Sequence, residues 1–221
     1  MPIDLFAFDM AGTTVQDDDV VLQTFLDVAA GEELPVEPEW LRARMGWDKA
    51  AVFSELLARS GRQAALASEL ALRFQEHLAA RYERQPPRAI AGVAEAFEAL
   101  EARGVRIGFT TGFARATADL ILERIGWSHL PSVASDEVDH GRPAPDLIFE
   151  LMRRTGFRDV SCVGAAGDTP SDLLAASAAG CGIVVGVGTG SHRLVQLRAA
   201  PHTHLVDDLR GLGAIVDGGA R

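Results

Sequence analysis

Lysine is scarce in this chain of 221 residues. Lys49 is the only lysine among the 21 Lys and Arg residues, and the formal net charge is −10. Proteins that bind nucleic acid or anionic membranes need a basic patch, so the acidic balance argues against both. Arg cannot replace Lys where a neutral amine must react, because the guanidinium stays protonated. Lys49 is therefore a candidate for covalent chemistry, with chance survival of one lysine as the alternative.

Cysteines and long apolar runs are scarce as well. Cys162 and Cys181 lie in apolar runs that predict strands, so we expect buried thiols in a reducing compartment rather than a disulfide or metal pair. No apolar run is long enough to cross a bilayer. The first residues lack the basic stretch of a signal peptide, so we expect a cytoplasmic protein.

Apolar periodicity predicts an α/β protein with a helical insertion. From residue 92 onward helices alternate with strands, and we expect the strands of the whole chain at 3–8, 105–109, 132–134, 160–163 and 183–187. Such alternation is typical of a doubly wound parallel sheet covered on both faces. Between residues 17 and 85 the pattern is helical, with helices expected near 20–28, 39–45, 49–59 and 63–83. This predicts a core domain of residues 1–15 and 86–221 and a helical cap domain of residues 16–85.

Polar side chains stand at or near the ends of several expected strands. They are Asp9, Thr110, Arg142, Asp168 and Asp172. The carboxyl ends of parallel strands share one edge, so these side chains can converge there. Three carboxylates around a gap repel one another unless a cation neutralises them, and hard oxygen ligands suit Mg²⁺. A hydroxyl and an Arg beside them suit a phosphoryl group. Each residue alone has an ordinary alternative, such as an Asp that ends a strand and starts a turn.

The pattern Asp9-Met10-Ala11-Gly12-Thr13, followed by Thr110, Arg142 and Gly167-Asp168-x-x-x-Asp172, resembles the haloacid dehalogenase superfamily. The resemblance covers almost the whole chain and implies a Rossmann-like core with a mobile cap. It implies that Asp9 is a nucleophile that forms an aspartyl-phosphate. It further implies Mg²⁺ held by Asp9, the carbonyl of Ala11 and Asp168, with Asp172 close by. Thr110 and Arg142 would hold the phosphoryl group, and we expect five further residues to contact the substrate: Gly12, Thr13, Met45, Thr111 and Gly112.

Two features resemble the phosphonoacetaldehyde hydrolases and their phosphonatase-like relatives. Ala11 stands where superfamily phosphatases carry the acid that protonates an alkoxide leaving group. Met45-Gly46-x-x-Lys49 matches the context of a cap lysine that forms an imine with the substrate aldehyde. The resemblance implies cleavage of the C–P bond of a small carbonyl-bearing phosphonate, phosphonoacetaldehyde or a close analogue. The chain departs from that family at Val52, where phosphonatases carry a His.

The expected chemistry explains why an acid at position 11 is dispensable. A carbanion leaves phosphorus poorly, but an imine at the neighbouring carbon accepts its electrons as an enamine. Lys49 must be neutral to attack an aldehyde, and the pKa of a free Lys is about 10.4. Burial under a cap and a place in the first turn of a helix would both lower that pKa, and Asp48 can cap this helix.

Two other functions stay open at this point: a phosphatase that acts on small phosphate esters, and a phospho-binding domain without catalysis. His202 and His204 are candidate metal ligands, although a turn and the start of a strand describe them better. A homodimer is compatible with the sequence, which does not decide the oligomeric state.

Overall fold

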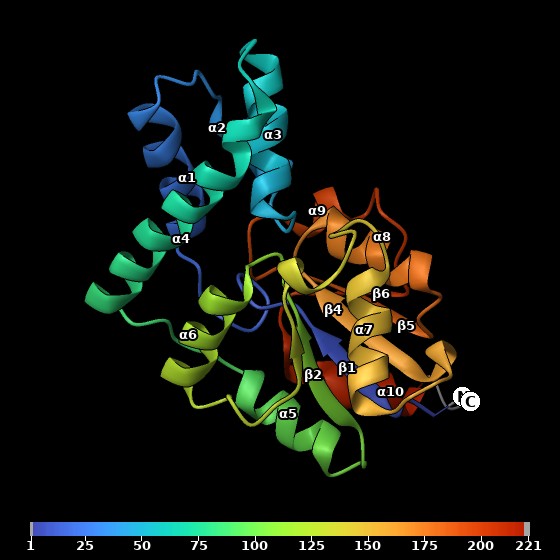
Figure 1. Cartoon of the computed structure of the whole chain (residues 1–221). Coiled ribbons are helices and arrows are strands. Elements are labelled where there is room, and N and C mark those ends of the chain that lie inside the picture. Colours follow the sequence, from blue (N-terminus) through green and yellow to red (C-terminus); the bar gives the residue numbers. More distant parts are fainter. Residues whose placement is uncertain (1, 219–221) are drawn as a thin grey trace.

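The fold is a single parallel sheet covered by helices on both faces. The computed structural model describes residues 2–218, and in that part of the chain six strands run in the order β3-β2-β1-β4-β5-β6 (Figure 1). All five neighbouring pairs are parallel. The doubly wound parallel sheet predicted from the sequence is therefore confirmed. The strands are β1 (Leu5–Phe8), β2 (Arg106–Thr110), β3 (Ser132–Val133), β4 (Val163–Gly167), β5 (Ile183–Val187) and β6 (His204–Val206).

The centre of the sheet fixes where a ligand can bind. Phe8 of β1 is level with Phe109 of β2 on one side and with Ala166 of β4 on the other. The chain moves outward in one direction from β1 to β3 and in the opposite direction from β4 to β6. Ligands of open α/β sheets bind beyond the carboxyl ends of the strands at such a reversal point. The residues that follow β1, β2 and β4 therefore meet at one edge.

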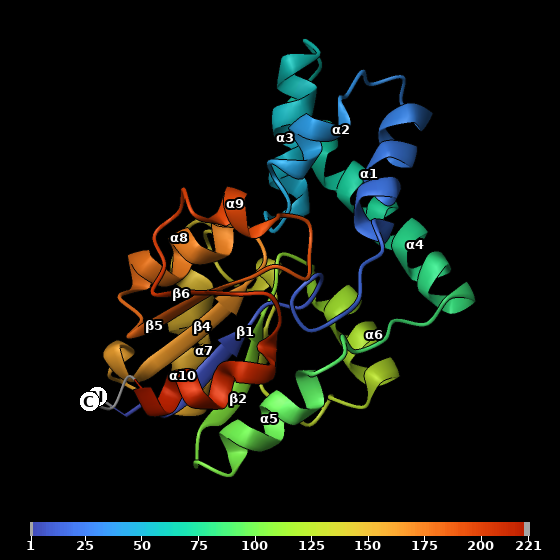
Figure 2. The same ribbon diagram turned by 180° about the vertical axis from the view of Figure 1, so that it is seen from behind.

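Helices on the two faces bury alternate residues of each strand. Leu5 and Ala7 belong to the apolar core on one face, whereas Phe6 and Phe8 belong to the core on the other. This is the two-residue period of a strand. One face is covered by α7 (Asp146–Thr155), α8 (Pro170–Ala179) and α9 (Leu194–Leu197). Figure 2 shows the opposite face, covered by α5 (Val93–Glu101) and α10 (Leu212–Gly218), with α6 (Arg115–Ile125) beside α5.

Four helices, here called the cap helices, stand above the carboxyl edge of the sheet (Figure 1). Their packing centres on Phe25, whose ring centroid lies 5.2 Å from that of Phe53 and 4.5 Å from that of Phe74. Within residues 16–85 the structure has helices joined by loops and no strand, as the periodicity predicts, and the status of this insertion as a separate mobile domain stays a prediction. The cap helices are α1 (Val20–Gly31), α2 (Pro38–Arg42), α3 (Lys49–Arg59) and α4 (Ala67–Arg84).

The expected bounds of the strand before Asp168 were wrong. The segment Val160–Cys162 is a short 3-10 turn rather than a strand, because the Asp159 carboxylate accepts a hydrogen bond from Ser161 N at 3.0 Å. The strand begins only at Val163 and continues through small residues. A Cβ at Gly164 would lie 2.4 Å from the Phe6 ring, so glycine lets that ring pack against the strand.

The two cysteines were also expected in strands, and this was wrong. Cys162 closes the 3-10 turn, and Cys181 lies in the loop before β5, so neither is in a strand. Both are only half-buried, so the expectation of buried thiols was wrong, whereas both are free thiols, as expected.

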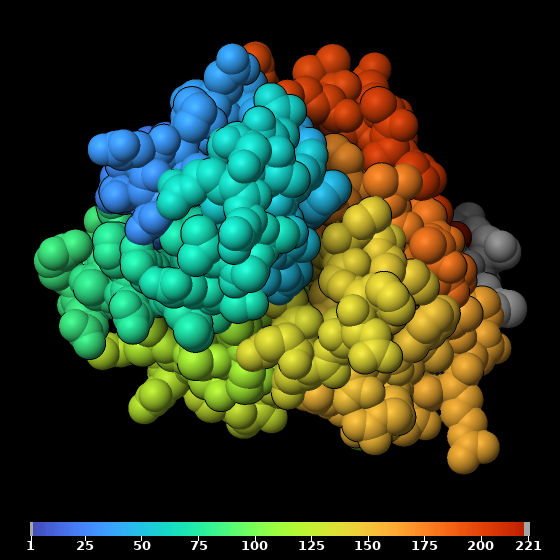
Figure 3. All heavy atoms as spheres, turned by 45° about the horizontal axis from the view of Figure 1, so that its top comes forward, coloured from blue at the N-terminus to red at the C-terminus, as the bar shows by residue number. Residues whose placement is uncertain are grey.

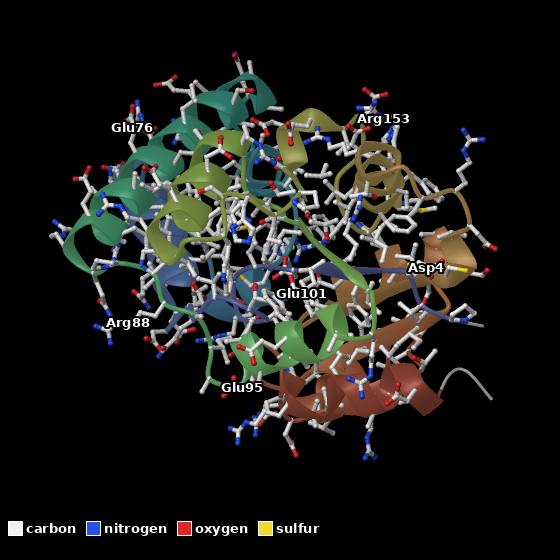
Figure 4. All side chains as sticks on the ribbon, turned by 90° about the horizontal axis from the view of Figure 1, so that it is seen from below. Asp4, Glu76, Arg88, Glu95, Glu101 and Arg153 are labelled. Carbon is white, nitrogen blue, oxygen red and sulfur yellow. The ribbon has the colours of Figure 1, made fainter. Side chains whose placement is uncertain are left out.

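Charged side chains cover the outside of the molecule. Figure 4 shows Glu76 of α4, Glu95 of α5 and Arg153 of α7 pointing away from the interior. Across residues 2–218, none of the helices combines the length and the hydrophobicity that crossing a membrane requires.

Candidate active site

Three carboxylates meet at the carboxyl edge of the sheet. Asp9 directly follows β1, Asp168 directly follows β4, and Asp172 lies in the first turn of α8. All three are buried, and each offers an oxygen within 4.8 Å of the others. Asp172 is fixed by a reciprocal cap of α8, in which its Oδ2 accepts a hydrogen bond from Thr169 N at 2.9 Å. The structure thus brings together the three carboxylates that the sequence places at strand ends.

Arg142 reaches into this cluster from the loop before α7. Its Nη1 lies 2.5 Å from Asp9 Oδ1 and 2.6 Å from Asp172 Oδ1. Its Nη2 donates to both the carbonyl and the hydroxyl oxygen of Thr110, each at 2.7 Å. The guanidinium therefore joins the ends of β1, β2 and α8, and its side chain is only 3% exposed. A buried Arg in such a fork suits a phosphoryl group, which it can bind with two parallel hydrogen bonds.

The turn after Asp9 packs against Asp168. Gly12 has φ +87°, and a Cβ there would lie 2.7 Å from Asp168 Oδ2, so both conformation and space require glycine. Thr13 donates to Asp168 Oδ1 at 3.2 Å, and Thr14 donates to the carbonyl of Asp9 at 2.8 Å. Ala11 is half-buried within this turn. Gly12 and Thr13, expected at the substrate, thus lie against Asp168.

Burial dominates the electrostatics of the carboxylates. It raises the pKa of Asp9 to about 6 against the opposing effect of Arg142. Burial also raises the pKa of Asp168 well above its usual range, and the charges of Asp9 and Asp172 raise it further. The single positive charge of Arg142 does not offset the negative charges of three buried carboxylates. Oxygen donors, burial and excess negative charge are what a divalent cation such as Mg²⁺ requires, so these residues fit that ion.

Lys49 approaches the same region from the cap helices. It is the first residue of α3, whose N-terminus is capped by Asp48 through a 2.8 Å hydrogen bond from Ala51 N to Oδ1. Lys49 is 6% exposed, and its Nζ lies 4.9 Å from the centroid of the Phe113 ring. Burial lowers the pKa of Lys49 to about 8, with Asp48 and then Asp9 acting in the opposite direction. The predicted helix start and its cap by Asp48 are confirmed.

The loop before Lys49 closes the site against the core. Trp47 Nε1 donates to Ser171 Oγ at 2.7 Å, and Ser135 Oγ donates to Asp48 Oδ2 at 3.0 Å. A Cβ at Gly112 would lie 2.5 Å from the carbonyl oxygen of Gly46, so glycine permits this close approach. Figure 3 shows the blue and teal cap helices packed directly against the yellow core segments. The arrangement is a closed one.

The remaining predicted site residues lie in the loop before α3, directly after β2, and at or just before the start of β6. Met45 is 7% exposed in the closing loop. Thr111 uses its hydroxyl oxygen locally, accepting from Phe113 N at 3.1 Å. His202 Nδ1 lies 2.8 Å from the carbonyl oxygen of Ala200, and His204 begins β6. In the described part of the chain, the metal-ligand grouping includes neither histidine, which agrees with their interpretation as a turn and a strand start.

Some residues near the site were not predicted from the sequence. Trp47 and Ser171 meet across 124 positions of sequence, and Ser191 contacts Asp168 through two hydrogen bonds. No local pattern marks such pairs. Asp17 is buried with its pKa raised to about 6 by burial, and its Oδ1 accepts from Val21 N at 3.1 Å. The Asp17 side chain thus binds a backbone N–H in the first turn of α1.

Comparison with known proteins agrees with this geometry. A phosphonoacetaldehyde hydrolase of Bacteroides fragilis is 30% identical over 192 residues, which cover 77% of this chain and 71% of the relative. The phosphonoacetaldehyde hydrolase of Bacillus cereus is 29% identical over 217 residues, covering 88% and 79%.

Solved structures share the fold. A phosphonoacetaldehyde hydrolase-like protein of Oleispira antarctica has a TM-score of 0.87 at 18% identity, covering 99% of this chain and 93% of that one. A predicted phosphoglycolate phosphatase of Haemophilus somnus has a TM-score of 0.75 at 22% identity, covering 96% and 97%. The family model of haloacid dehalogenase-like hydrolases matches residues 3–180. The chain therefore belongs to the haloacid dehalogenase-like hydrolases.

Proposed function

We propose that this hydrolase is Mg²⁺-dependent and phosphonatase-like, and that it cleaves the C–P bond of a small carbonyl-bearing phosphonate. Phosphonoacetaldehyde is the leading candidate. The observation that carries the proposal is the environment of Lys49. The chain's only lysine is buried, its pKa is lowered to about 8, and the charge of Asp9 acts on it. These observations support a mechanism in which a reactive amine and a carboxylate nucleophile act on one small molecule.

The metal ion would be held by Asp9, the carbonyl of Ala11, Asp168 and Asp172. When bound, Mg²⁺ supplies positive charge that offsets the charge of the phosphonyl oxygens. Arg142 would orient the same oxygens, because its guanidinium spans the distance between Asp9 and Thr110. We assign Gly12, Thr13, Met45, Thr111 and Gly112 to the walls around the substrate.

The first steps would occur at Lys49. Its neutral amine adds to the substrate carbonyl carbon, and loss of water leaves an imine whose protonated nitrogen withdraws electrons. Asp9 then attacks phosphorus, the C–P bond breaks, and its electron pair moves onto the carbon skeleton as an enamine. The products of this step are an aspartyl-phosphate at Asp9 and an enamine at Lys49. Because the iminium nitrogen accepts the electrons, no acid is required at Ala11.

Two hydrolyses complete the turnover. The enamine takes up a proton at carbon and returns to an imine, and water releases the aldehyde and the free amine of Lys49. A second water cleaves the aspartyl-phosphate to phosphate and regenerates Asp9. The water taken up exceeds the water lost at imine formation by one, which balances the overall hydrolysis. The proposed cap, residues 16–85, would open to release the products and close to bury Lys49 again.

A small-molecule phosphatase is the second candidate. The similarity in fold to the predicted phosphoglycolate phosphatase favours it, and Ala11 argues against it. A phospho-binding domain without catalysis would not need the buried set of Asp9, Arg142 and Asp168. Phosphate release from a panel of phosphonates and phosphate esters separates these candidates.

Trapping of the imine is the decisive experiment. Sodium borohydride added with phosphonoacetaldehyde should reduce the imine to a secondary amine, inactivate the enzyme and label Lys49. Peptide mass mapping can assign the label, because the N-terminal amine is the only other primary amine in the sequence. Lys49→Arg should lose C–P cleavage yet keep its affinity for Mg²⁺, since arginine cannot form the imine. Near-normal activity of Lys49→Arg on phosphonates would overturn the imine mechanism.

A further inference from the structure

The loop that follows β5 holds Asp168, the residue directly after β4, through hydrogen bonds. Ser191 makes two hydrogen bonds to Asp168 Oδ2, from its backbone N at 2.7 Å and from its Oγ at 2.9 Å. The other carboxylate oxygen, Oδ1, accepts from Thr13 at 3.2 Å. The two oxygens of Asp168 are therefore held by different segments of the chain, which leaves the carboxylate little freedom to rotate.

The residue after Ser191, His192, also takes part in this hydrogen-bond network. A serine hydroxyl has a single proton, and Ser191 donates it to Asp168. Because that proton is used on Asp168, we assign the proton of the His192 ring to Nδ1, which lies 3.0 Å from Ser191 Oγ and can donate to it. The three groups then form one chain of donors, from His192 through Ser191 to the carboxylate. His192 is 7% exposed, and burial shields this chain from competing water.

Steric fit ties the loop to the rest of the site. A Cβ at Gly190 would lie 2.1 Å from Asp168 Oδ2, so this position requires glycine. Thr189 donates to the carbonyl oxygen of Gly12 at 2.7 Å, which joins the loop to the turn after Asp9. The loop thus contacts both Asp168 and the turn that carries the proposed nucleophile.

We propose that Ser191 and His192 are positioning residues for the divalent cation. They fix the orientation of the Asp168 carboxylate so that it is ready to ligate before the ion arrives. Groups that orient a ligating side chain typically change metal affinity or activity by about 10- to 100-fold when they are replaced. The inference rests on the metal assignment of the proposed function and is independent of the imine chemistry at Lys49.

The test measures Mg²⁺ binding to the full chain without substrate, by titration calorimetry and by the Mg²⁺-dependent shift of Tm. Ser191→Ala should raise the Kd for Mg²⁺ by about 10-fold or more, whereas Ser191→Thr keeps the hydroxyl and should remain near wild type. Ser60→Ala is the matched control, because it removes a hydroxyl that bonds Leu56 O within the cap helices, far from Asp168 in sequence.

A second pair of variants tests the same chain of donors without altering Ser191. The side-chain amide of His192→Asn can replace the Nδ1 donor, whereas His192→Leu removes it. We expect weaker Mg²⁺ binding for the leucine variant than for the asparagine variant, and this pair decides the matter if Ser191→Ala does not fold.

Two results would overturn the inference. One is Ser191→Ala binding Mg²⁺ within about twofold of wild type, and the other is equal affinity in the two His192 variants. A wild type that binds no Mg²⁺ would overturn the metal assignment itself. If borohydride traps no imine but the Ser191 and His192 variants still bind Mg²⁺ more weakly, the imine mechanism fails and this inference stands.

Discussion

Lys49 Nζ donates a hydrogen bond to the carbonyl oxygen of Trp47 at 3.0 Å, two residues earlier in the chain. Its other close neighbours include the rings of Phe113, at 4.9 Å, and Phe25, at 5.9 Å. Within residues 2–218 no carboxylate lies at ion-pair distance from this amine. The environment therefore holds the amine in place without strongly favouring its charged form, as an attacking amine requires.

The pH dependence of catalysis should follow the Lys49 amine. Its pKa of about 8 means that the neutral, attacking form increases as the pH rises through that value. We expect kcat/KM on phosphonoacetaldehyde to fall by about tenfold per pH unit well below 8 and to level off above it. Steady-state assays at saturating Mg²⁺ measure this. A flat profile between about pH 6 and 9 would be inconsistent with attack by a neutral amine.

Removal of the Lys49 charge should stabilise the fold. At pH 7 the amine is protonated in both the folded and the unfolded chain, so the folded state carries the full cost of a pKa lowered from 10.5 to about 8. Lys49→Met should therefore raise the free energy of unfolding at pH 7 by an amount on the order of 3 kcal/mol, less the lost hydrogen bond and cation–π contacts.

The pH dependence of the free energy of unfolding tests whether the charge of Lys49 destabilises the fold. The unfolded chain binds the additional proton between pH 8 and 10.5, so the wild type gains stability from this group as the pH rises through that interval. Urea unfolding at pH 7 and pH 10 should show a larger difference between Lys49→Met and wild type at pH 7. A Lys49→Met protein that is less stable than wild type at pH 7 would show that the contacts of the amine outweigh its burial.

The carboxylate cluster should depend on a divalent cation. EDTA should abolish activity, and added Mg²⁺ should restore it and raise Tm, since a ligand that binds only the folded state stabilises it. Asp168→Asn removes one charge of the cluster, so we expect most of the activity and most of the Mg²⁺-induced rise in Tm to be lost. Full activity of the wild type after EDTA treatment and gel filtration would contradict the metal assignment.

The contact between Trp47 and Ser171 should stabilise the closed form. Trp47→Phe keeps an aromatic ring, although a smaller one than indole, and removes the donor of the 2.7 Å hydrogen bond. A hydrogen bond contributes about 1 kcal/mol, so kcat/KM should fall by about fivefold, and Ser171→Ala should have a similar effect. Trp40→Phe is the matched control, because Trp40 Nε1 is buried without a hydrogen-bond partner in the described structure. Equal effects of the Trp47 and Trp40 variants would exclude a specific role for the Ser171 bond.

The sequence predicts those parts of the site that depend on local pattern. Asp9 and Thr110 were found because each stands at the end of an apolar strand, Asp168 because it lies a few residues after one, and all three because parallel strands share an edge. The start of β4 was missed, because Asp159 turns the chain and small residues at 164–167 give a weak strand signal. Contacts such as those of Trp47 and Ser191 arise only when distant segments meet, so a single sequence offers no sign of them.

The central place of β1 has a consequence for how the chain folds during synthesis. Leu5 pairs with Arg106 on one side and Val163 on the other, so the first strand emerges from the ribosome long before either partner exists. The cap helices are built from neighbouring segments, and contacts that are local in sequence form fast. The cap helices can pack around Phe25 while the apolar strand Leu5–Phe8 still has no partner strand. Until those partners are made, this apolar strand is unpaired and therefore prone to aggregate.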